Sequence, residues 1–275
     1  MNGLTNIASR SFVSRASERQ SVADLLEPLD RLAAHSPNLL TRSAGRFEAG
    51  GESYELPRYL FIWPSAGDDP IRIGLFAGIH GDEPEGIHAL TQLLGKLEQR
   101  PELAAGYCLF VYPVCNPTGF EDGTRHSRAG RDLNREFWRD SSEPEVVLLQ
   151  EELWAHSFHG VVSLHTDDTS HGVYGYASGP TLTRHLLEPA LAAASQLLPR
   201  NLDPRIDGFP ATQGIISAGY GGILAAPPKL QPRPFEIILE SPKAAPEQVK
   251  HQALVRALES ILEEYRRFIA YARNL

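Results

Sequence analysis

The chain has 275 residues, of which 42% are hydrophobic, so it is long enough to bury one sizeable core. Its 26 basic and 34 acidic side chains give a formal charge of −8 without long blocks of one sign, which disfavours a nucleic-acid partner. The first residues lack the apolar run of a signal peptide, and no window has the length of a membrane span. We therefore expect a soluble, cytoplasmic protein with no membrane partner.

Helical and strand patterns alternate along the chain. Leucines at helical spacing in residues 19–35 predict an N-terminal helix, and a polar stretch leading into LPRYLFIW predicts an edge hairpin. Because no repeat or linker interrupts the pattern, we expect a single domain over residues 1–275, with residues 1–45 as a helical lead-in. Further strands are predicted at 71–78, 106–117, 159–165, 173–177 and 235–240, further helices at 85–99, 144–156, 180–197 and 246–272, and long loops at 117–140 and 201–234.

This alternation predicts an α/β fold in three layers, with a central, mostly parallel sheet between helices. In such sheets, ligands bind beyond the carboxyl ends of the strands. His80, Asn116, His165 and Glu240 each fall at or just beyond a predicted strand end. Residues far apart in the sequence are therefore expected to meet at one edge of the sheet.

The turn GIHGDEPEG carries a histidine and a glutamate three residues apart, His80 and Glu83. Imidazole nitrogens and carboxylate oxygens bind zinc at about 2.0 to 2.2 Å, and a catalytic zinc usually has three protein ligands with one open position. His165 is the expected third ligand, which predicts one zinc ion per chain. Taken alone, the H-x-x-E triplet occurs often by chance and more commonly forms a solvated turn. Its position directly after a buried strand favours a ligand role. The loop histidines His126 and His171 remain candidates for contacts with the ligands or the substrate.

Four ordered blocks carry a resemblance to a known family: HGDE (80–83), NPTGFEDGTRHSRAGRDLNREF (116–137), SLHTDDT (163–169) and IILESP (237–242). At these residues the sequence resembles the M14-type zinc carboxypeptidases and their relatives, the succinylglutamate desuccinylases and aspartoacylases. The resemblance implies a mixed sheet of about eight strands between helices. It also implies zinc ligands at His80, Glu83 and His165, and it assigns roles to the following residues: Glu240 as general base, Arg125 at the scissile carbonyl, and Asn134 with Arg135 at the substrate's terminal carboxylate.

The same chemistry follows from the residue types. Zinc lowers the pKa of bound water toward about 7, so a nearby carboxylate such as Glu240 can take its proton and pass it to the leaving amine. Glu236 is the rival, because residues four apart share one strand face; position at the strand end favours Glu240. A guanidinium group grips a carboxylate in two places, which suits Arg135 to the free C-terminus and Arg125 to an oxyanion.

The roles of several residues near the expected zinc ligands stay open. Tyr220 in SAGYGGI is the best match for the family's tyrosine that caps the substrate carboxylate, with Tyr174 and Tyr176 as competitors. Asp167, Asp168 and His171 follow His165 and would bind a cationic group, contact the zinc ligands or contribute to a second metal site. Cys108 and Cys115, seven apart around one strand, are expected to be reduced packing residues.

The leading functional prediction is a zinc metallocarboxypeptidase that hydrolyses a C-terminal peptide bond with a zinc-activated water and a glutamate base. The alternative is an N-acyl amino acid deacylase of the desuccinylase and aspartoacylase type, favoured by the compact length and the short spacing between Glu83 and His165. A third reading is a zinc-binding module without catalysis. Glu240 argues against it, because a structural zinc would more often be closed by a fourth Cys or His. The expected partner is a small peptide or an N-acyl amino acid.

Overall fold

The computed structural model describes residues 21–64 and 69–272. Part of the predicted lead-in, including the first two residues of the helix predicted at 19–35, lies outside these ranges. The rest of that helix is α1, Val22–His35, whose N-cap Ser21 accepts a hydrogen bond from the backbone of Asp24. In the part of the chain that the structure describes, no helix combines the length and the hydrophobicity needed to cross a membrane.

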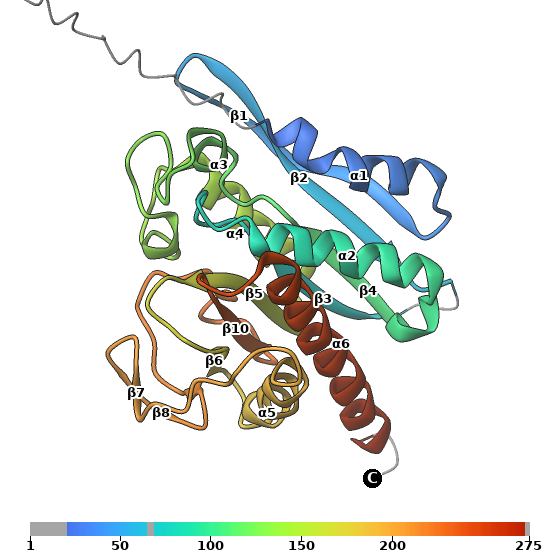
Figure 1. Ribbon diagram of the computed structural model, residues 1–275. Helices are drawn as coiled ribbons and strands as arrows, with labels where there is room; N and C mark the ends of the chain where they lie inside the picture. Colours follow the sequence, from blue (N-terminus) through green and yellow to red (C-terminus); the bar gives the residue numbers. More distant parts are fainter. Residues whose placement is uncertain (1–20, 65–68, 273–275) are drawn as a thin grey trace, which may run out of the picture.

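The centre of the molecule is a ten-stranded sheet in the order β1-β2-β4-β3-β5-β10-β6-β9-β8-β7 (Figure 1). The long strands are β1 (Leu39–Ala49), β2 (Glu52–Ile62), β3 (Ile71–Phe76), β4 (Tyr107–Tyr112), β5 (Gly160–Asp167), β6 (Tyr174–Ser178) and β10 (Phe235–Pro242). The short ones are β7 (Arg205–Ile206), β8 (Phe209–Thr212) and β9 (Ile215–Ile216).

The predicted α/β class is confirmed, but the sheet differs from the prediction in two respects. It has ten strands among the described residues, because three very short strands form in the segment predicted as a loop. The central strands β4, β3, β5 and β10 run parallel to one another, and β6 pairs parallel with the short β9. The other pairs, such as β1 with β2, β2 with β4 and β6 with β10, are antiparallel. Parallel strands need buried faces on both sides, and the near-continuous apolar runs of β3 and β4 meet that need.

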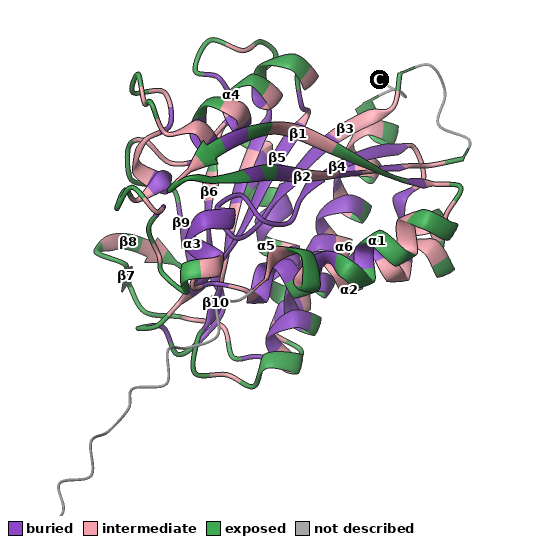
Figure 2. Cartoon of the chain, turned by 90° about the horizontal axis from the view of Figure 1, so that it is seen from above, coloured by how far each residue is buried: buried purple, intermediate pink, exposed green. Residues whose placement is uncertain are grey.

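Helices cover both faces of this sheet, as predicted (Figure 2). One face carries α1, α2 (Glu85–Gln99), α5 (Leu182–Ala194) and α6 (Glu247–Ala272), whose leucines form the larger core cluster with β3, β4 and β10. The other face carries α4 (Pro144–His156), which packs Val146, Leu149 and Leu153 against Phe76 and Phe110. Cys108 and Cys115 are buried and unpaired, as expected.

The loop predicted at 117–140 begins with a short helix, α3 (Pro117–Asp122), and contains a 3-10 turn at Leu133–Arg135. Asn116 caps α3, since its side chain accepts a hydrogen bond from Gly119 N at 2.8 Å, and Pro117 stands at the first helical position. This segment crosses the carboxyl ends of the central strands, where β3, β5 and β10 deliver His80, His165 and Glu240.

Candidate metal centre

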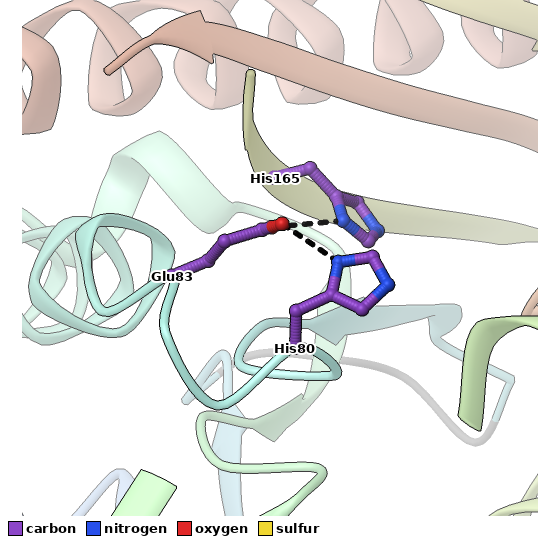
Figure 3. Close-up of side chains that lie close together, drawn as sticks. All are labelled: His80, Glu83 and His165. Atoms are coloured by element: carbon purple, nitrogen blue, oxygen red, sulfur yellow. Dashed lines mark hydrogen bonds and ion pairs between the residues drawn. The ribbon is translucent and has the colours of Figure 1, made fainter. Parts of the chain in front are cut away.

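Three buried side chains from two strand ends converge beyond the central sheet (Figure 3). His80 Nδ1 lies 2.7 Å from Glu83 Oε1, and His165 Nδ1 lies 3.1 Å from Glu83 Oε2. One ligand atom from each residue lies within 4.8 Å of the others, and all three residues are at most 6% exposed. In the described part of the chain this is the one group of three or more metal-binding side chains close enough to share an ion.

The far sides of both imidazole rings are held by other side chains. His80 Nε2 lies 3.3 Å from Asp132 Oδ1, and His165 Nε2 lies 2.8 Å from Ser163 Oγ. Without a metal, the Nδ1–H group of each ring can donate to Glu83. With a cation bound, a proton on each Nε2 would satisfy Asp132 and Ser163 and leave the Nδ1 lone pairs for the cation. The backbone amide of Thr166 donates to Glu83 Oε2 at 3.1 Å and fixes the carboxylate.

This donor set fits a zinc ion. Around one zinc ion with bonds of about 2.1 Å, neighbouring ligand atoms of a tetrahedral site lie roughly 3.4 Å apart. The two His–Glu contacts, at 2.7 and 3.1 Å, are somewhat shorter than this distance, and one ligand atom from each residue lies within 4.8 Å of the others. Two imidazoles and one carboxylate leave a fourth position free, which is the arrangement of catalytic rather than structural zinc.

The electrostatics of the three groups favour a shared cation. Burial alone would raise the pKa of the Glu83 carboxyl, but hydrogen bonds from His165 and His80 outweigh it and hold that pKa below its ordinary range. Burial lowers the pKa of His165, which favours the neutral ring that a metal needs. For His80, the contacts with Asp132 and Glu83 overcome burial and raise the pKa.

Two glycines let the chain turn tightly around this centre. Gly78 has a φ of +60°, in the left-handed region that favours glycine. Gly81 lies so close to α3 that a Cβ there would come within 2.0 Å of the backbone carbon of Gly119. The ligand turn is therefore pressed directly against α3.

Glu240 lies beside this centre on β10. Its Cα pairs with that of His165 on β5 and, on the other side, with that of Tyr174 on β6. Burial, followed by the charges of Glu83 and Asp167, raises the pKa of the Glu240 carboxyl well above its ordinary value. In the chain as described, no protein group forms a hydrogen bond with this carboxylate, which lines an open cavity.

Glu236, the other candidate for the general base, lies outside this cavity. Glu236 pairs with Val161 and Ser178, four residues back along β10, and its Oε1 accepts a hydrogen bond from Ala226 N at 2.8 Å. It does not line the cavity that contains the three-residue cluster. The geometry thus agrees with the choice of Glu240 over Glu236.

The cavity beyond the cluster has a volume of about 290 Å³, and it is lined by all the residues that were assigned a metal-binding, catalytic or substrate-binding role: His80, Glu83, His165, Glu240, Arg125, Asn134, Arg135 and Tyr220. Arg125 donates from Nε and Nη2 to Asp132 Oδ2 at 3.2 and 3.1 Å, and its Nη1 lies 3.4 Å from Glu83 Oε1. Asn134 is buried and accepts a hydrogen bond from Leu224 N at 2.8 Å. Its position is therefore fixed by the loop that follows β9.

Arg135 and Tyr220 form the opposite wall. The Arg135 guanidinium carbon lies 4.1 Å from the centre of the Tyr220 ring, a cation–π contact, and the Tyr220 hydroxyl donates to Asp207 Oδ1 at 3.1 Å. Tyr220 is 40% exposed, unlike its competitors Tyr174 and Tyr176, which are buried and donate to Asp167 and Asp207. An exposed tyrosine is the one of the three that can rearrange most easily around a ligand.

The remaining candidate residues differ in whether they line the cavity. Asp167 and Asp168 line the cavity, whereas His126 and His171 do not. None of these four belongs to the metal-binding group, so the described residues contain no second cluster of that kind. Asn116, which was expected at the same edge, serves as the cap of α3.

Two residues that contact the histidines were not predicted as parts of the site. Asp132 lies within the D-L-N-R block, in which only Asn134 and Arg135 were expected to act, and Ser163 begins the S-L-H triplet. The period of two along a strand places Ser163 and His165 on one face, which is a usable signal. No local pattern indicates that Asp132, 52 residues beyond His80, reaches its ring.

Comparison with known proteins adds independent information. Residues 70–202 match the family described as succinylglutamate desuccinylase/aspartoacylase catalytic domain, a range that includes the metal-binding group but neither Tyr220 nor Glu240. No curated protein matches the chain.

Solved structures with the same fold include two proteins described only provisionally as metallopeptidases. One, from Shewanella baltica OS155, has a TM-score of 0.71 at 22% identity, with 88% of this chain and 91% of that chain covered. The other, from Shewanella denitrificans OS217, has a TM-score of 0.69 at 26% identity and covers 88% of both chains. Carboxypeptidase A from Helicoverpa armigera has a TM-score of 0.69 at 17% identity, with 93% and 75% covered.

The fold, the clustered His80, Glu83 and His165, and the matched catalytic-domain family agree with one another. The matched catalytic domain over residues 70–202 and the shared fold support the expected superfamily, that of the zinc carboxypeptidases in the broad sense that includes the succinylglutamate desuccinylases and aspartoacylases.

Proposed function

We propose that this protein is a zinc-dependent carboxypeptidase that cleaves the last peptide bond of a small peptide with a free C-terminus. The observation that supports this most is the pairing of two sites in one cavity. Arg135 and Asn134, suited to holding a carboxylate, line the same cavity as the metal-binding group and Glu240. An enzyme acting on internal bonds has no use for a carboxylate anchor at this position.

His80, Glu83 and His165 would hold the ion, one per chain. A zinc ion there supplies Lewis acidity, which polarises a carbonyl group and brings the pKa of a water molecule toward about 7. Asp132 and Ser163 would orient the two rings through their Nε2 atoms.

Glu240 would take the proton of the attacking water and deliver it to the nitrogen of the leaving amine. Its carboxylate faces the cavity with no protein hydrogen bond in the described structure to restrain it. Burial raises its pKa above the ordinary value, which strengthens it as a proton acceptor. Arg125 would stabilise the negative charge that develops on the carbonyl oxygen. To do so it must exchange part of its contact with Asp132 for the substrate.

Arg135 and Asn134 would bind the terminal carboxylate, and Tyr220 would close over it. Arg135 donates to the backbone oxygen of Asn134 at 2.7 Å, so one edge of the guanidinium is fixed by the protein and the remaining nitrogens are free to bind a ligand. This binding orients the scissile bond between the metal-binding group and Glu240.

A second candidate is an N-acyl amino acid deacylase, and the match of residues 70–202 to the desuccinylase and aspartoacylase catalytic domain favours it. Both reactions release an amino acid with a free α-carboxylate, so they use Arg135 and Glu240 in the same way. They differ only in the group on the other side of the scissile bond.

The test combines metal analysis with a substrate screen. We expect about one zinc per chain, and hydrolysis of peptides with a free C-terminus that the matching C-terminal amides do not undergo. Equal cleavage of free and amidated peptides would contradict a carboxypeptidase. Release of acetate or succinate from N-acyl amino acids, with peptides untouched, would establish the deacylase instead. A metal-loaded protein that cleaves neither class would point to a zinc-binding module without catalysis.

A further inference from the structure

A second cavity of about 180 Å³ adjoins the first along β10. The two cavities share Tyr176, Gly219, Tyr220, Ile223 and Ile238 as lining residues. Ile238 precedes Glu240 by two residues and therefore faces the same side of the strand. The second cavity thus begins beside the residues proposed to act on the substrate and extends back along the strand.

Among the described residues that line this second cavity, Glu236 is the only charged one. It stands four residues before Glu240 on the same strand face, at a separation of about 13 Å. Its side chain is 12% exposed, and one carboxylate oxygen is held by the backbone amide of Ala226. The walls around it are mainly apolar and include Val161, Leu224 and Ala225.

The cation nearest to Glu236 lies on the opposite side of it. Arg233 Nη2 is 3.4 Å from Glu236 Oε2, but Arg233 is 57% exposed and lines a different, outer cavity that Glu236 also borders. Arg233 Nη2 also donates a hydrogen bond to Glu236 Oε2 at this distance, but solvent screens the charge of the exposed guanidinium and leaves part of the Glu236 charge uncompensated.

A carboxylate in a mainly apolar cavity favours a ligand side chain with a cationic end over a neutral or an acidic one. A neutral side chain that fills the cavity removes water from the carboxylate without replacing its hydrogen bonds, and an acidic one adds repulsion. A long side chain with a cationic end places its methylene groups against Ile238 and Leu224 and its charge on Glu236. At about 30 Å³ per water-sized group, the cavity holds about six such groups, which suits a side chain of lysine length.

We infer that the second cavity binds the side chain of the released amino acid and that Glu236 makes this site specific for a cationic side chain, as in lysine or ornithine. The inference rests on the proposed function, because the amino acid is positioned by the Arg135 anchor. It applies equally to a C-terminal residue of a peptide and to an N-acyl amino acid.

The test compares substrates that differ only in the group that would reach Glu236. Matched pairs end in lysine or in norleucine, which lacks only the ammonium group, and each pair is prepared as a peptide and as an N-acyl amino acid. We expect kcat/KM of the wild-type protein to be at least tenfold higher for lysine. Glu236→Gln, which keeps the acceptor for Ala226 N, should bring the lysine to norleucine ratio close to one. Arg233→Gln is the control and should keep the lysine preference.

A wild-type ratio near one, or a ratio that Glu236→Gln leaves intact, would overturn the inference. Because the wild-type ratio needs no variant, the result does not depend on how well Glu236→Gln folds. Binding of free lysine and free norleucine, measured by calorimetry, separates this inference from the proposed function. If no substrate is cleaved but lysine binds and Glu236→Gln loses it, the specificity site stands while the proposed reaction fails. If substrates are cleaved without a preference for lysine, the proposed reaction stands and the specificity site fails. A wild-type protein that does not bind lysine would contradict the specificity site directly.

Discussion

Glu240 and His165 stand side by side on neighbouring parallel strands, with their Cα atoms paired in the ladder between β10 and β5. The proposed base and a proposed metal ligand are therefore held by the same backbone hydrogen bonds. We expect Glu240→Gln to lower kcat by about 10²- to 10⁴-fold, because the proton transfer is lost. Zinc content, measured by plasma mass spectrometry, should stay at the wild-type level. Unchanged turnover would refute the proposed role of Glu240.

The contact of Asp132 with His80 leads to a prediction about metal affinity. Asp132→Asn keeps the size of the side chain but removes the charge that orients the ring, and such changes typically cost about 10- to 100-fold in affinity. Competition with a zinc chelator would measure the loss. Asp203→Asn, at an exposed site outside the cavity, is the matched control and should bind zinc like the wild type. Equal affinities of the two variants would show that Asp132 does not support the ligand.

Arg135 provides a test of substrate anchoring. Arg135→Gln should raise KM for substrates with a free carboxylate by at least about tenfold, since a charge-assisted contact is worth roughly 1.5 to 3 kcal/mol. Arg135→Lys should recover only part of the loss, because lysine lacks the planar pair of donors. Steady-state kinetics on free and amidated substrates measures both effects, with the exposed Arg184→Gln as control. An amidated substrate that suffers the same loss would argue against a carboxylate anchor.

Gly81 tests the packing of the ligand turn against α3. Gly81→Ala places a Cβ within 2.0 Å of the Gly119 backbone, which cannot move without shifting α3, so we expect a loss of about 1–3 kcal/mol or more in unfolding free energy. Gly95→Ala is the control: a Cβ there meets no atom within 4 Å, and the helical site should gain about 0.5–1 kcal/mol. Urea denaturation measures both. If Gly81→Ala were as stable as the wild type, the close approach would be wrong.

The raised pKa of Glu240 predicts that this residue destabilises the folded, metal-free protein by an amount that depends on pH. Because its pKa in the folded state lies above that of an unfolded chain, near 4.5, the native state loses stability as pH rises past 4.5 toward the folded pKa. Glu240→Gln removes this cost. Its thermal midpoint should exceed that of the wild type at pH 7 by at least about 2 °C, at 2–4 °C per kcal/mol, and the difference should vanish near pH 4. A difference independent of pH would assign the effect to packing instead.

Much of the fold could be predicted from the sequence because its main elements have strong periodicity. The buried runs of β3 and β4 and the amphipathic patterns of α2 and α6 begin and end within a few residues of the predicted positions. The three short strands β7 to β9 could not be predicted, since two to four residues carry no period. The helix α3 was missed although Asn116 and Pro117 are good start signals, because it has only six residues.

The proposed site residues were found because each follows a strand end or belongs to a motif of distinctive spacing. What the sequence could not give is the set of contacts between motifs. Asp132 reaches His80 across 52 residues, and Glu236 lies in a separate cavity from Glu240 although the two share one strand face. Such relationships depend on the twist of the sheet and the path of long loops, which no local pattern encodes.

The metal-binding residues and Glu240 come from a different part of the chain than several residues of the segment 201–234 that line the same cavity. This separation has a practical consequence. His165 and Glu240 lie on central strands, and His80 and Glu83 lie in the turn that follows β3. Asp207, Gly219, Tyr220 and Ile223 come instead from a segment with only short strands. Side chains of that segment can be varied without altering the spacing that the β5 and β10 ladder imposes, provided that the backbone contacts of Leu224 with Asn134 and of Ala226 with Glu236 are kept. Libraries confined to Asp207, Gly219 and Ile223 should therefore alter substrate preference while the metal-binding group and Glu240 stay in place, which makes this chain a practical starting scaffold for redesigning specificity.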